Sequence, residues 1–274
     1  MAMELVSIPS PTTPLDGLYY APDAQPARNA ALLFHGNGMN FYTGAPRFLP
    51  GPLFELGLAS LAFNRHGHDT VSAPTRKAEG NAYQTVAESF ADNELAAGYL
   101  AARGFDAPVV IGHSNGGLLA AHYAAAHPET PALVLLSAHS GGREMVERGS
   151  RLGLFGRDRL PEISAQAHAL VAAGRGDELL IMPGWFYVTT AASFVDLEAN
   201  TPVLLEAAPK ISCPVLYLRG DQENPEQYPT DAFAAAATTE VETVVVPDCD
   251  HYYVGREAEV TRLVIGWLAD VLGE

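Results

Sequence analysis

The sequence predicts an α/β fold with a mostly parallel central sheet of about eight strands flanked by helices. Two observations lead to this class. Short runs of β-branched and aliphatic residues alternate with longer helix-forming runs along most of the chain. The later strand candidates, such as Val109–Ile111 and Leu133–Leu136, are almost continuously apolar. Such strands are typically buried on both faces, as in a parallel sheet covered by helices.

The expected elements are spread over the whole chain. The strands cover residues 3–8, 16–21, 30–35, 58–63, 108–112, 132–137, 214–219 and 241–246. The helices cover about 46–57, 83–104, 115–127, 229–237 and 256–272. The first two strands carry polar interruptions and have no helix between them, so they are expected to form an antiparallel hairpin.

The alternation breaks between residues 141 and 205, where glycines separate several expected short helices, one of them at 161–173. This segment is rich in aromatic and aliphatic residues, so it is interpreted as an insertion rather than a linker. The expected organisation is therefore a core formed by 1–140 and 206–274, with 141–205 inserted into it.

Composition limits the possible partners and location. The 274 residues carry a formal net charge of −16 without a local cluster of Lys and Arg, which argues against nucleic acid as a partner. Two cysteines, Cys213 and Cys249, lie outside any C-x-x-C pattern, as is common in a reducing compartment. The N-terminal residues lack a signal-peptide pattern, and no apolar run approaches the ~20 residues that span a membrane. A cytoplasmic protein without a membrane partner is expected, and its oligomeric state is left open.

The most informative motif is Gly-His-Ser-Asn-Gly-Gly at residues 112–117. It fits the pattern G-x-S-x-G between an expected strand and an expected helix, which is typical of a nucleophile elbow. Gly112 and Gly116 would let the two backbones approach closely, and the turn would hold the Ser114 hydroxyl out into a cleft. The N-terminus of the helix would then point its free N–H groups at the group that the serine attacks. Ser114 is therefore the candidate nucleophile.

A serine hydroxyl needs a base, and the base needs an orienting carboxylate. In an elbow fold these partners follow the serine in the order acid, then histidine. His251 lies in a loop just after the last expected strand, where α/β sheets place their ligands, and is the candidate base. The loop after the strand 214–219 offers two carboxylates, Asp221 and Glu223, and either could orient His251.

At these positions the chain resembles the α/β-hydrolase superfamily over nearly its whole length. Residues 112–116 match its elbow, Phe34–Gly38 its His-Gly loop after the third strand, Asp250–His251 its histidine loop, and 213–223 its acid-bearing strand. The resemblance implies an α/β-hydrolase fold in which 141–205 forms a small helical cap between strands 6 and 7.

The resemblance also implies roles for particular residues. The acid of the family commonly falls three residues after the glycine of this strand, which favours Glu223 over Asp221, although the usual residue there is Asp. In the family, the residues after His-Gly and after the nucleophile supply the backbone N–H groups of the oxyanion hole. These positions are Asn37 and Asn115 in this sequence.

The segment Asn64–Asp69 suggests a metal site at first, because His66, His68 and Asp69 have a spacing seen in zinc proteins. The full H-x-H-x-D-H pattern is absent from the sequence, so a structural loop is the favoured interpretation. No metal and no cofactor are expected.

Apolar side chains in the insertion could line a substrate pocket or pack between insertion and core. The candidates for substrate binding are Phe155, Trp185, Phe186 and Tyr187. If they line the pocket, the substrate is a small molecule with an apolar part.

The sequence thus predicts a cofactor-independent serine hydrolase that cleaves a small-molecule ester through an acyl-enzyme. Two alternatives use the same residues: hydrolysis of a carbon–carbon bond in a diketone, and thioester cleavage. A third alternative, from another class, is a non-catalytic ligand-binding protein that shares the fold.

Overall fold

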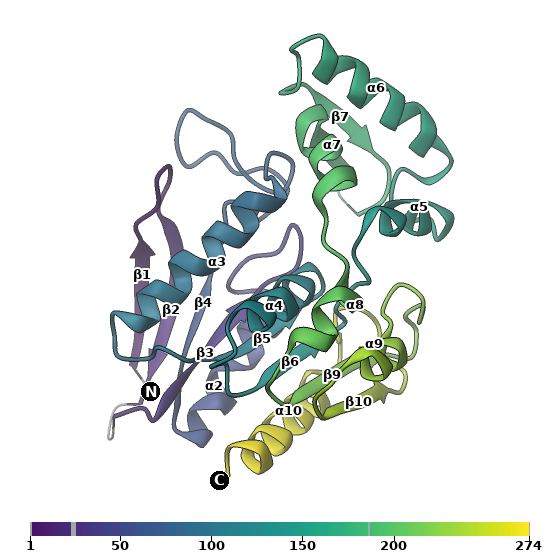
Figure 1. The fold of residues 1–274 in the computed structure, drawn as a ribbon. Coiled ribbons are helices and arrows are strands. Elements are labelled where there is room, and N and C mark those ends of the chain that lie inside the picture. Colours follow the sequence, from purple (N-terminus) through teal and green to yellow (C-terminus); the bar gives the residue numbers. More distant parts are fainter. Residues whose placement is uncertain (1, 23–25, 186, 274) are drawn as a thin grey trace.

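The computed structural model describes residues 2–22, 26–185 and 187–273 (Figure 1). Its main sheet has eight strands in the order β1-β2-β4-β3-β5-β6-β9-β10. The strands are β1 (Ala2–Ile8), β2 (Leu15–Ala21), β3 (Asn29–Phe34), β4 (Leu58–Phe63), β5 (Val109–His113), β6 (Leu133–Leu136), β9 (Val215–Gly220) and β10 (Val241–Val246). All eight lie close to their expected positions.

The pairing is parallel from β4 to β10 and antiparallel at the other edge. β1 pairs with β2, and β2 with β4, in antiparallel register, which confirms the expected N-terminal hairpin. From β4 across β3, β5, β6 and β9 to β10 every pair is parallel. The carboxyl ends of β5, β6 and β9 therefore meet at one edge of the sheet, and the loops that follow them lie together.

Helices cover both faces of the sheet. The helices on the first face are α3 (Val86–Ala101), α4 (Asn115–Ala126), α8 (Leu204–Ala207) and α9 (Thr230–Ala236), which contribute buried side chains to one apolar cluster. The helices on the second face are α1 (Ala45–Phe48), α2 (Pro50–Leu53) and α10 (Glu257–Leu272), which contribute to a second cluster. The two clusters meet opposite faces of the same strands, as the continuously apolar strand sequences predict.

Two expected helices differ in extent from the structure. The expected helix 46–57 is divided into α1, α2 and the 3-10 turn η1 (Phe54–Leu56), because Pro50 and Pro52 have no N–H to continue a single helix. The expected helix 83–104 begins at Val86. Thr85 caps it through a capping box with Glu88.

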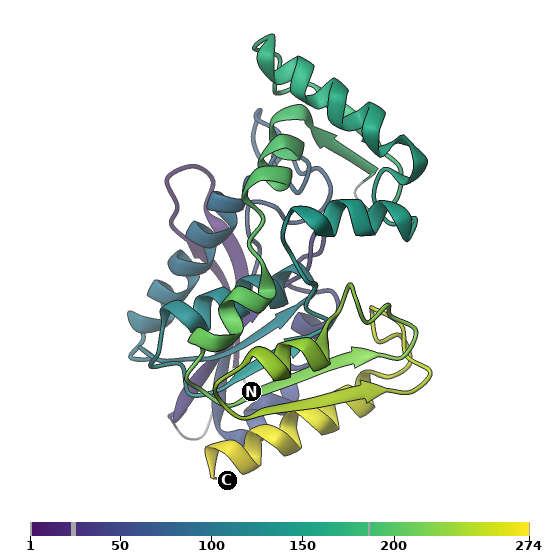
Figure 2. The ribbon, with the colours of Figure 1, turned by 45° about the vertical axis from the view of Figure 1, so that its right-hand side comes forward.

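The insertion stands beside the sheet as a separate group of elements (Figures 1 and 2). Its helices are α5 (Arg143–Arg151), η2 (Arg157–Arg159), α6 (Leu160–Ala172) and α7 (Ala191–Asn200), and its strands are β7 (Leu179–Met182) and β8 (Tyr187–Thr190). The 3-10 turn η3 (Ala208–Lys210) follows α8 in the core. The insertion has an apolar cluster of its own, which includes Met145, Phe155 and Phe194.

The insertion contains the expected short helices and also a two-stranded sheet that the sequence did not predict, in which β7 and β8 pair in antiparallel register. Leu179–Met182 alternates between exposed and buried side chains, which is the period of a strand with one solvated face. Leu204, at the end of the expected insertion, packs in the core cluster of the first face. Among the described residues, no helix combines the length and apolar character needed to cross a bilayer.

Candidate active site

Ser114 occupies a sharp turn between β5 and α4. Its backbone has φ 56° and ψ −121°, a conformation that L-residues rarely adopt and that functional sites often contain. The neighbouring glycines make this turn possible. A Cβ atom on Gly112 would lie 2.2 Å from the carbonyl oxygen of Gly116, and one on Gly116 would lie 2.2 Å from that of Phe34. The strand, the turn and the helix can therefore approach this closely only without side chains at these two positions.

A chain of contacts joins three of the residues predicted to form the site. Oγ of Ser114 lies 3.0 Å from Nε2 of His251, and Nδ1 of His251 lies 2.6 Å from Oε1 of Glu223. These distances are short enough for the imidazole to accept a proton from the serine while a carboxylate orients it. The three residues come from the loops after β5, β9 and β10, which meet at one edge of the sheet.

The second carboxylate oxygen of Glu223 is also held. Oε2 accepts hydrogen bonds from Oγ of Ser137 at 2.6 Å and from the backbone N–H of Gly220 at 2.7 Å. The Ser137 hydroxyl also lies 2.6 Å from the hydroxyl of Tyr253. Sequence reasoning missed Ser137 and Tyr253. The only signal available was the position of Ser137 directly after a buried strand, next to the other active-site loops.

The structure places Asp221 elsewhere. Its two carboxylate oxygens accept hydrogen bonds from the backbone N–H groups of Asp248 and Cys249, at 3.0 and 3.1 Å. These bonds, led by that from Cys249, lower the pKa of Asp221. Asp221 thus fixes the loop that carries His251, whereas Glu223 contacts the imidazole itself.

Two buried histidines lie near His251. Burial lowers the pKa of His113 to about 3, and that of His139 to about 3, with the neighbouring His251 as a further cause in each case. Nε2–H of His113 donates to the carbonyl oxygen of His251 at 2.8 Å. His139 accepts from the N–H of Gly141 through Nδ1 at 3.1 Å, which leaves Nε2–H to face the side-chain oxygen of Asn115 at 3.2 Å. Both rings are neutral near pH 7, so they shape the site without adding positive charge.

Asn37 and Asn115 flank Ser114 in space. Asn115 is the first residue of α4, so its backbone N–H has no acceptor within the helix. Asn37 lies two residues after the buried His35 and lines the same pocket as Ser114. Among the described residues, neither backbone N–H donates to an acceptor. Both N–H groups are therefore free to donate to an oxygen of a bound molecule.

The Ser114 pocket is bounded by side chains from the core and the insertion. Trp185 stacks on the His251 ring, with centroids 5.2 Å apart and an interplanar angle of 17°, and Phe155 packs edge-on against Trp185. Both residues line the pocket, together with Met145. Tyr187 is 69% exposed and does not line it. Phe186 lies outside the described residues.

The segment Asn64–Asp69 forms a structural loop. Nδ1 of His66 lies 2.7 Å from Oδ1 of Asp92, which raises the pKa of His66, and Nδ1 of His68 donates to the carbonyl oxygen of Arg65. Within the part of the chain that the structure describes, no three His, Cys, Asp or Glu residues are grouped to hold a metal ion.

An eight-stranded, mostly parallel sheet with a serine on the turn after β5 defines an α/β hydrolase. A sequence model described as the alpha/beta hydrolase family matches residues 31–263. The chain therefore belongs to the alpha/beta hydrolase family and is a hydrolase.

Solved structures share the fold. Est1E from Butyrivibrio proteoclasticus is 20% identical with a TM-score of 0.71, over 98% of this chain and 99% of that chain. A thermostable carboxyl esterase from Bacillus coagulans is 17% identical with a TM-score of 0.71, over 99% of each chain. A dienelactone hydrolase from Anabaena variabilis is 17% identical with a TM-score of 0.61, over 98% of this chain and 97% of that chain. A search of curated protein sequences gave no significant match.

Proposed function

We propose that the protein is a serine hydrolase that cleaves a small-molecule ester through an acyl-enzyme. The single observation that carries this proposal is the contact chain from Ser114 through His251 to Glu223. The esterases among the structural neighbours also support an ester as the substrate.

In the first half of the proposed reaction, Oγ of Ser114 attacks the ester carbonyl carbon and its proton passes to Nε2 of His251. Nδ1–H stays bonded to Glu223, which stabilises the imidazolium. The carbonyl oxygen becomes an oxyanion and accepts hydrogen bonds from the backbone N–H groups of Asn37 and Asn115. Each such donor lowers the barrier by roughly 3 kcal/mol.

In the second half, the carbon–oxygen bond to the alcohol breaks as Nε2–H of His251 protonates the leaving oxygen. Water then attacks the acyl group on Ser114, with His251 accepting its proton and returning it to the serine oxygen. No cofactor is required for any of these steps. Phe155, Trp185 and Met145 line the pocket and would pack against an apolar part of the substrate.

The insertion is proposed to act as a cap over this pocket, since Met145, Phe155 and Trp185 all belong to it. A cytoplasmic location is part of the same proposal and is supported by the free thiols of Cys213 and Cys249.

Labelling with a fluorophosphonate probe tests the nucleophile. We expect covalent labelling of the native protein and none of the Ser114→Ala variant. No labelling of the native protein would favour a ligand-binding protein that shares the fold. Hydrolysis of p-nitrophenyl esters then tests the bond type. A labelled protein that ignores these esters but cleaves a diketone or a thioester would support one of the two alternative reactions on the same residues.

A further inference from the structure

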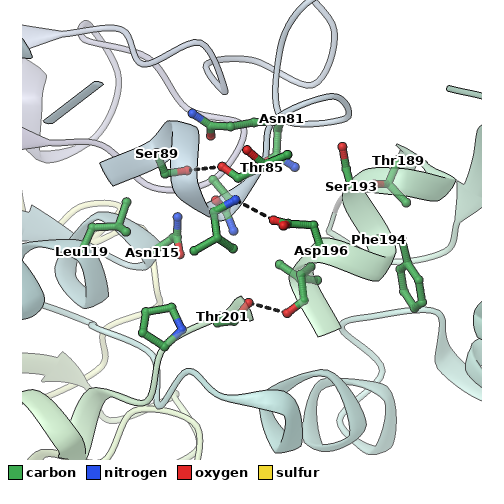
Figure 3. A pocket seen from close by; sticks show the side chains of 15 residues that line it. Asn81, Thr85, Ser89, Asn115, Leu119, Thr189, Ser193, Phe194, Asp196 and Thr201 are labelled. Carbon is green, nitrogen blue, oxygen red and sulfur yellow. Dashed lines mark hydrogen bonds between the residues drawn. The ribbon is translucent and has the colours of Figure 1, made fainter. Parts of the chain in front are cut away.

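A second cavity lies beside the Ser114 pocket, between the start of α3 and helix α7 of the insertion (Figure 3). We call it the side chamber. Asn37 lines both cavities, and Asn115, next to the nucleophile, lines the side chamber. The side chamber therefore adjoins the reacting centre at the two residues proposed to hold the oxyanion.

The walls of the side chamber carry hydrogen-bonding groups that the protein leaves unused. The side-chain amides of Asn37 and Asn81 make no hydrogen bond with any described residue. Ser193 accepts a hydrogen bond from Oγ1 of Thr190 at 2.8 Å, so its own hydroxyl hydrogen is available to a ligand. Unpaired polar groups in a concave site are the groups that fix and select a polar ligand.

The charge of the side chamber excludes one class of ligand. Among the described residues that line it there is no Lys, Arg or His, and the one charged side chain is Asp196. The carboxylate of Asp196 accepts from the N–H of Val86 and from Nδ2 of Asn200, both at 2.7 Å, so it is held in place. A bound carboxylate or phosphate would meet this negative charge without a cation to offset it. The lining thus suits an uncharged group.

The position of His251 decides which half of an ester enters the side chamber. His251 must reach the leaving oxygen to protonate it, so the alcohol half lies beside His251. His251 lines the Ser114 pocket with Trp185, and also a neighbouring cavity with Tyr228, but not the side chamber. The acyl half then extends away from His251, past Asn37 and Asn115.

We infer that the side chamber binds the acyl half of the substrate, and that this acyl group is uncharged and carries carbonyl, hydroxyl or amide groups. This inference rests on the proposed ester hydrolysis and adds its substrate class. The apolar walls, such as Leu119 and Leu197, would pack against the carbon skeleton, while the amides and Ser193 bind its polar atoms. The apolar part predicted for the substrate then belongs to the alcohol half, beside Trp185.

Three p-nitrophenyl esters of equal acyl size test the inference: 4-methylpentanoyl (apolar), 4-oxopentanoyl (neutral and polar) and succinyl (anionic). We expect kcat/KM to be highest for the 4-oxopentanoyl ester and lowest for the succinyl ester. Asn81→Leu keeps the side-chain shape and removes the amide. It should reduce the preference for 4-oxopentanoyl over 4-methylpentanoyl by roughly two- to tenfold, the effect of one hydrogen bond. Ser193→Ala should act in the same direction.

The matched control is Gln166→Leu, which removes an exposed amide on α6 that lines neither cavity and should leave the preference unchanged. A wild-type preference for the 4-methylpentanoyl ester, unaltered by Asn81→Leu, would overturn the inference while leaving the hydrolase proposal intact.

A binding measurement tests the side chamber independently of the proposed ester hydrolysis. NMR titration of Ser114→Ala with 4-oxopentanamide and 4-methylpentanamide needs no catalysis. Tighter binding of the 4-oxo compound, weakened by Asn81→Leu, would support the side chamber even if no ester were cleaved. Equal binding of the two amides would refute it.

Discussion

Asp196 of the insertion accepts a hydrogen bond of 2.7 Å from the backbone N–H of Val86, the first residue of α3 in the core. A second bond lies beside it, from the N–H of Thr190 to the carbonyl oxygen of Ala82 at 2.8 Å. The N–H of Val86 has no acceptor within its own helix, so the carboxylate of Asp196 supplies one. The positive end of a helix is also a favourable place for negative charge. The insertion is thus held against the core where the two form the side chamber.

Replacement of Asp196 by Ala should weaken this connection. We expect the free energy of unfolding to fall by about 1 kcal/mol, the usual effect of losing a side chain that caps a helix. The backbone amide of Val86 should also exchange its hydrogen faster. Urea denaturation and hydrogen exchange measure the two effects. Asp106→Ala, which removes an exposed carboxylate with no hydrogen bond among the described residues, is the control, and equal losses from both variants would contradict the expectation.

The two carboxylates after β9 should respond differently to conversion into amides. Glu223→Gln should lower kcat for ester hydrolysis by roughly a thousandfold or more, because the amide no longer holds the imidazole in the required tautomer. Asp221→Asn should keep kcat within about tenfold and lower the melting temperature instead, because an amide cannot accept from two backbone N–H groups with both of its heavy atoms. Steady-state kinetics and thermal denaturation would show the reverse pattern if Asp221 were the acid.

The parts of the site that could be predicted from the sequence are local or fixed by chain order. The turn at Ser114 follows from two glycines between a strand and a helix, and His251 from its loop after the last strand. The choice between Asp221 and Glu223 could not be made from the residues alone, since both follow the same strand. It depends on the direction in which each side chain leaves the loop, which only the folded backbone sets.

The features that were missed depend on contacts between distant segments. Ser137 and Tyr253 lie 116 positions apart and meet because β6 and the loop after β10 end at the same edge of the sheet. Tyr187 was a candidate for the pocket because of its aromatic ring, but it begins β8 with φ 58° and is exposed. Composition predicts that a segment has apolar side chains, whereas the backbone determines which of them face the site.

Ser137→Ala tests whether this hydroxyl positions Glu223. The variant removes the donor to Oε2 and leaves the contact between Oε1 and His251. We expect kcat to fall by roughly tenfold, the energy of one charge-assisted hydrogen bond, while KM changes little because Ser137 does not line the substrate pocket. A fall in stability with an unchanged kcat would assign Ser137 a purely structural role.

The buried histidines predict a loss of stability in mild acid. His113 and His139 stay neutral in the folded protein down to a pKa of about 3, whereas in the unfolded chain they take up protons near pH 6.5. The unfolded state binds more protons in this window, so their contribution is fully present above about pH 6.5 and is lost progressively toward pH 3. Each histidine contributes a slope of about 1.4 kcal/mol per pH unit.

His139→Asn isolates one of these contributions. The asparagine side-chain oxygen can replace Nδ1 as acceptor for the N–H of Gly141 but does not titrate. In urea denaturation below about pH 6, the slope should be shallower than in the wild type by about 1.4 kcal/mol per pH unit, whereas above about pH 7 the slopes of the two proteins should be equal. Parallel curves for the two proteins would mean that His139 does not titrate differently in the folded and unfolded states.

The elbow itself is tested by adding one methyl group. A Cβ on Gly116 would lie 2.2 Å from the carbonyl oxygen of Phe34 and 2.5 Å from that of His35. Both atoms belong to the backbone at the end of β3, so they cannot move aside as a flexible side chain would. Gly116→Ala should therefore cost more than about 3 kcal/mol of stability or prevent folding.

The matched variant is Gly266→Ala in α10, where a Cβ meets no atom within 4 Å and alanine is the better helix former. It should raise the free energy of unfolding by about 0.5–1 kcal/mol. Comparable stability of the two variants in urea denaturation would show that the close approach of α4 to β3 is not required.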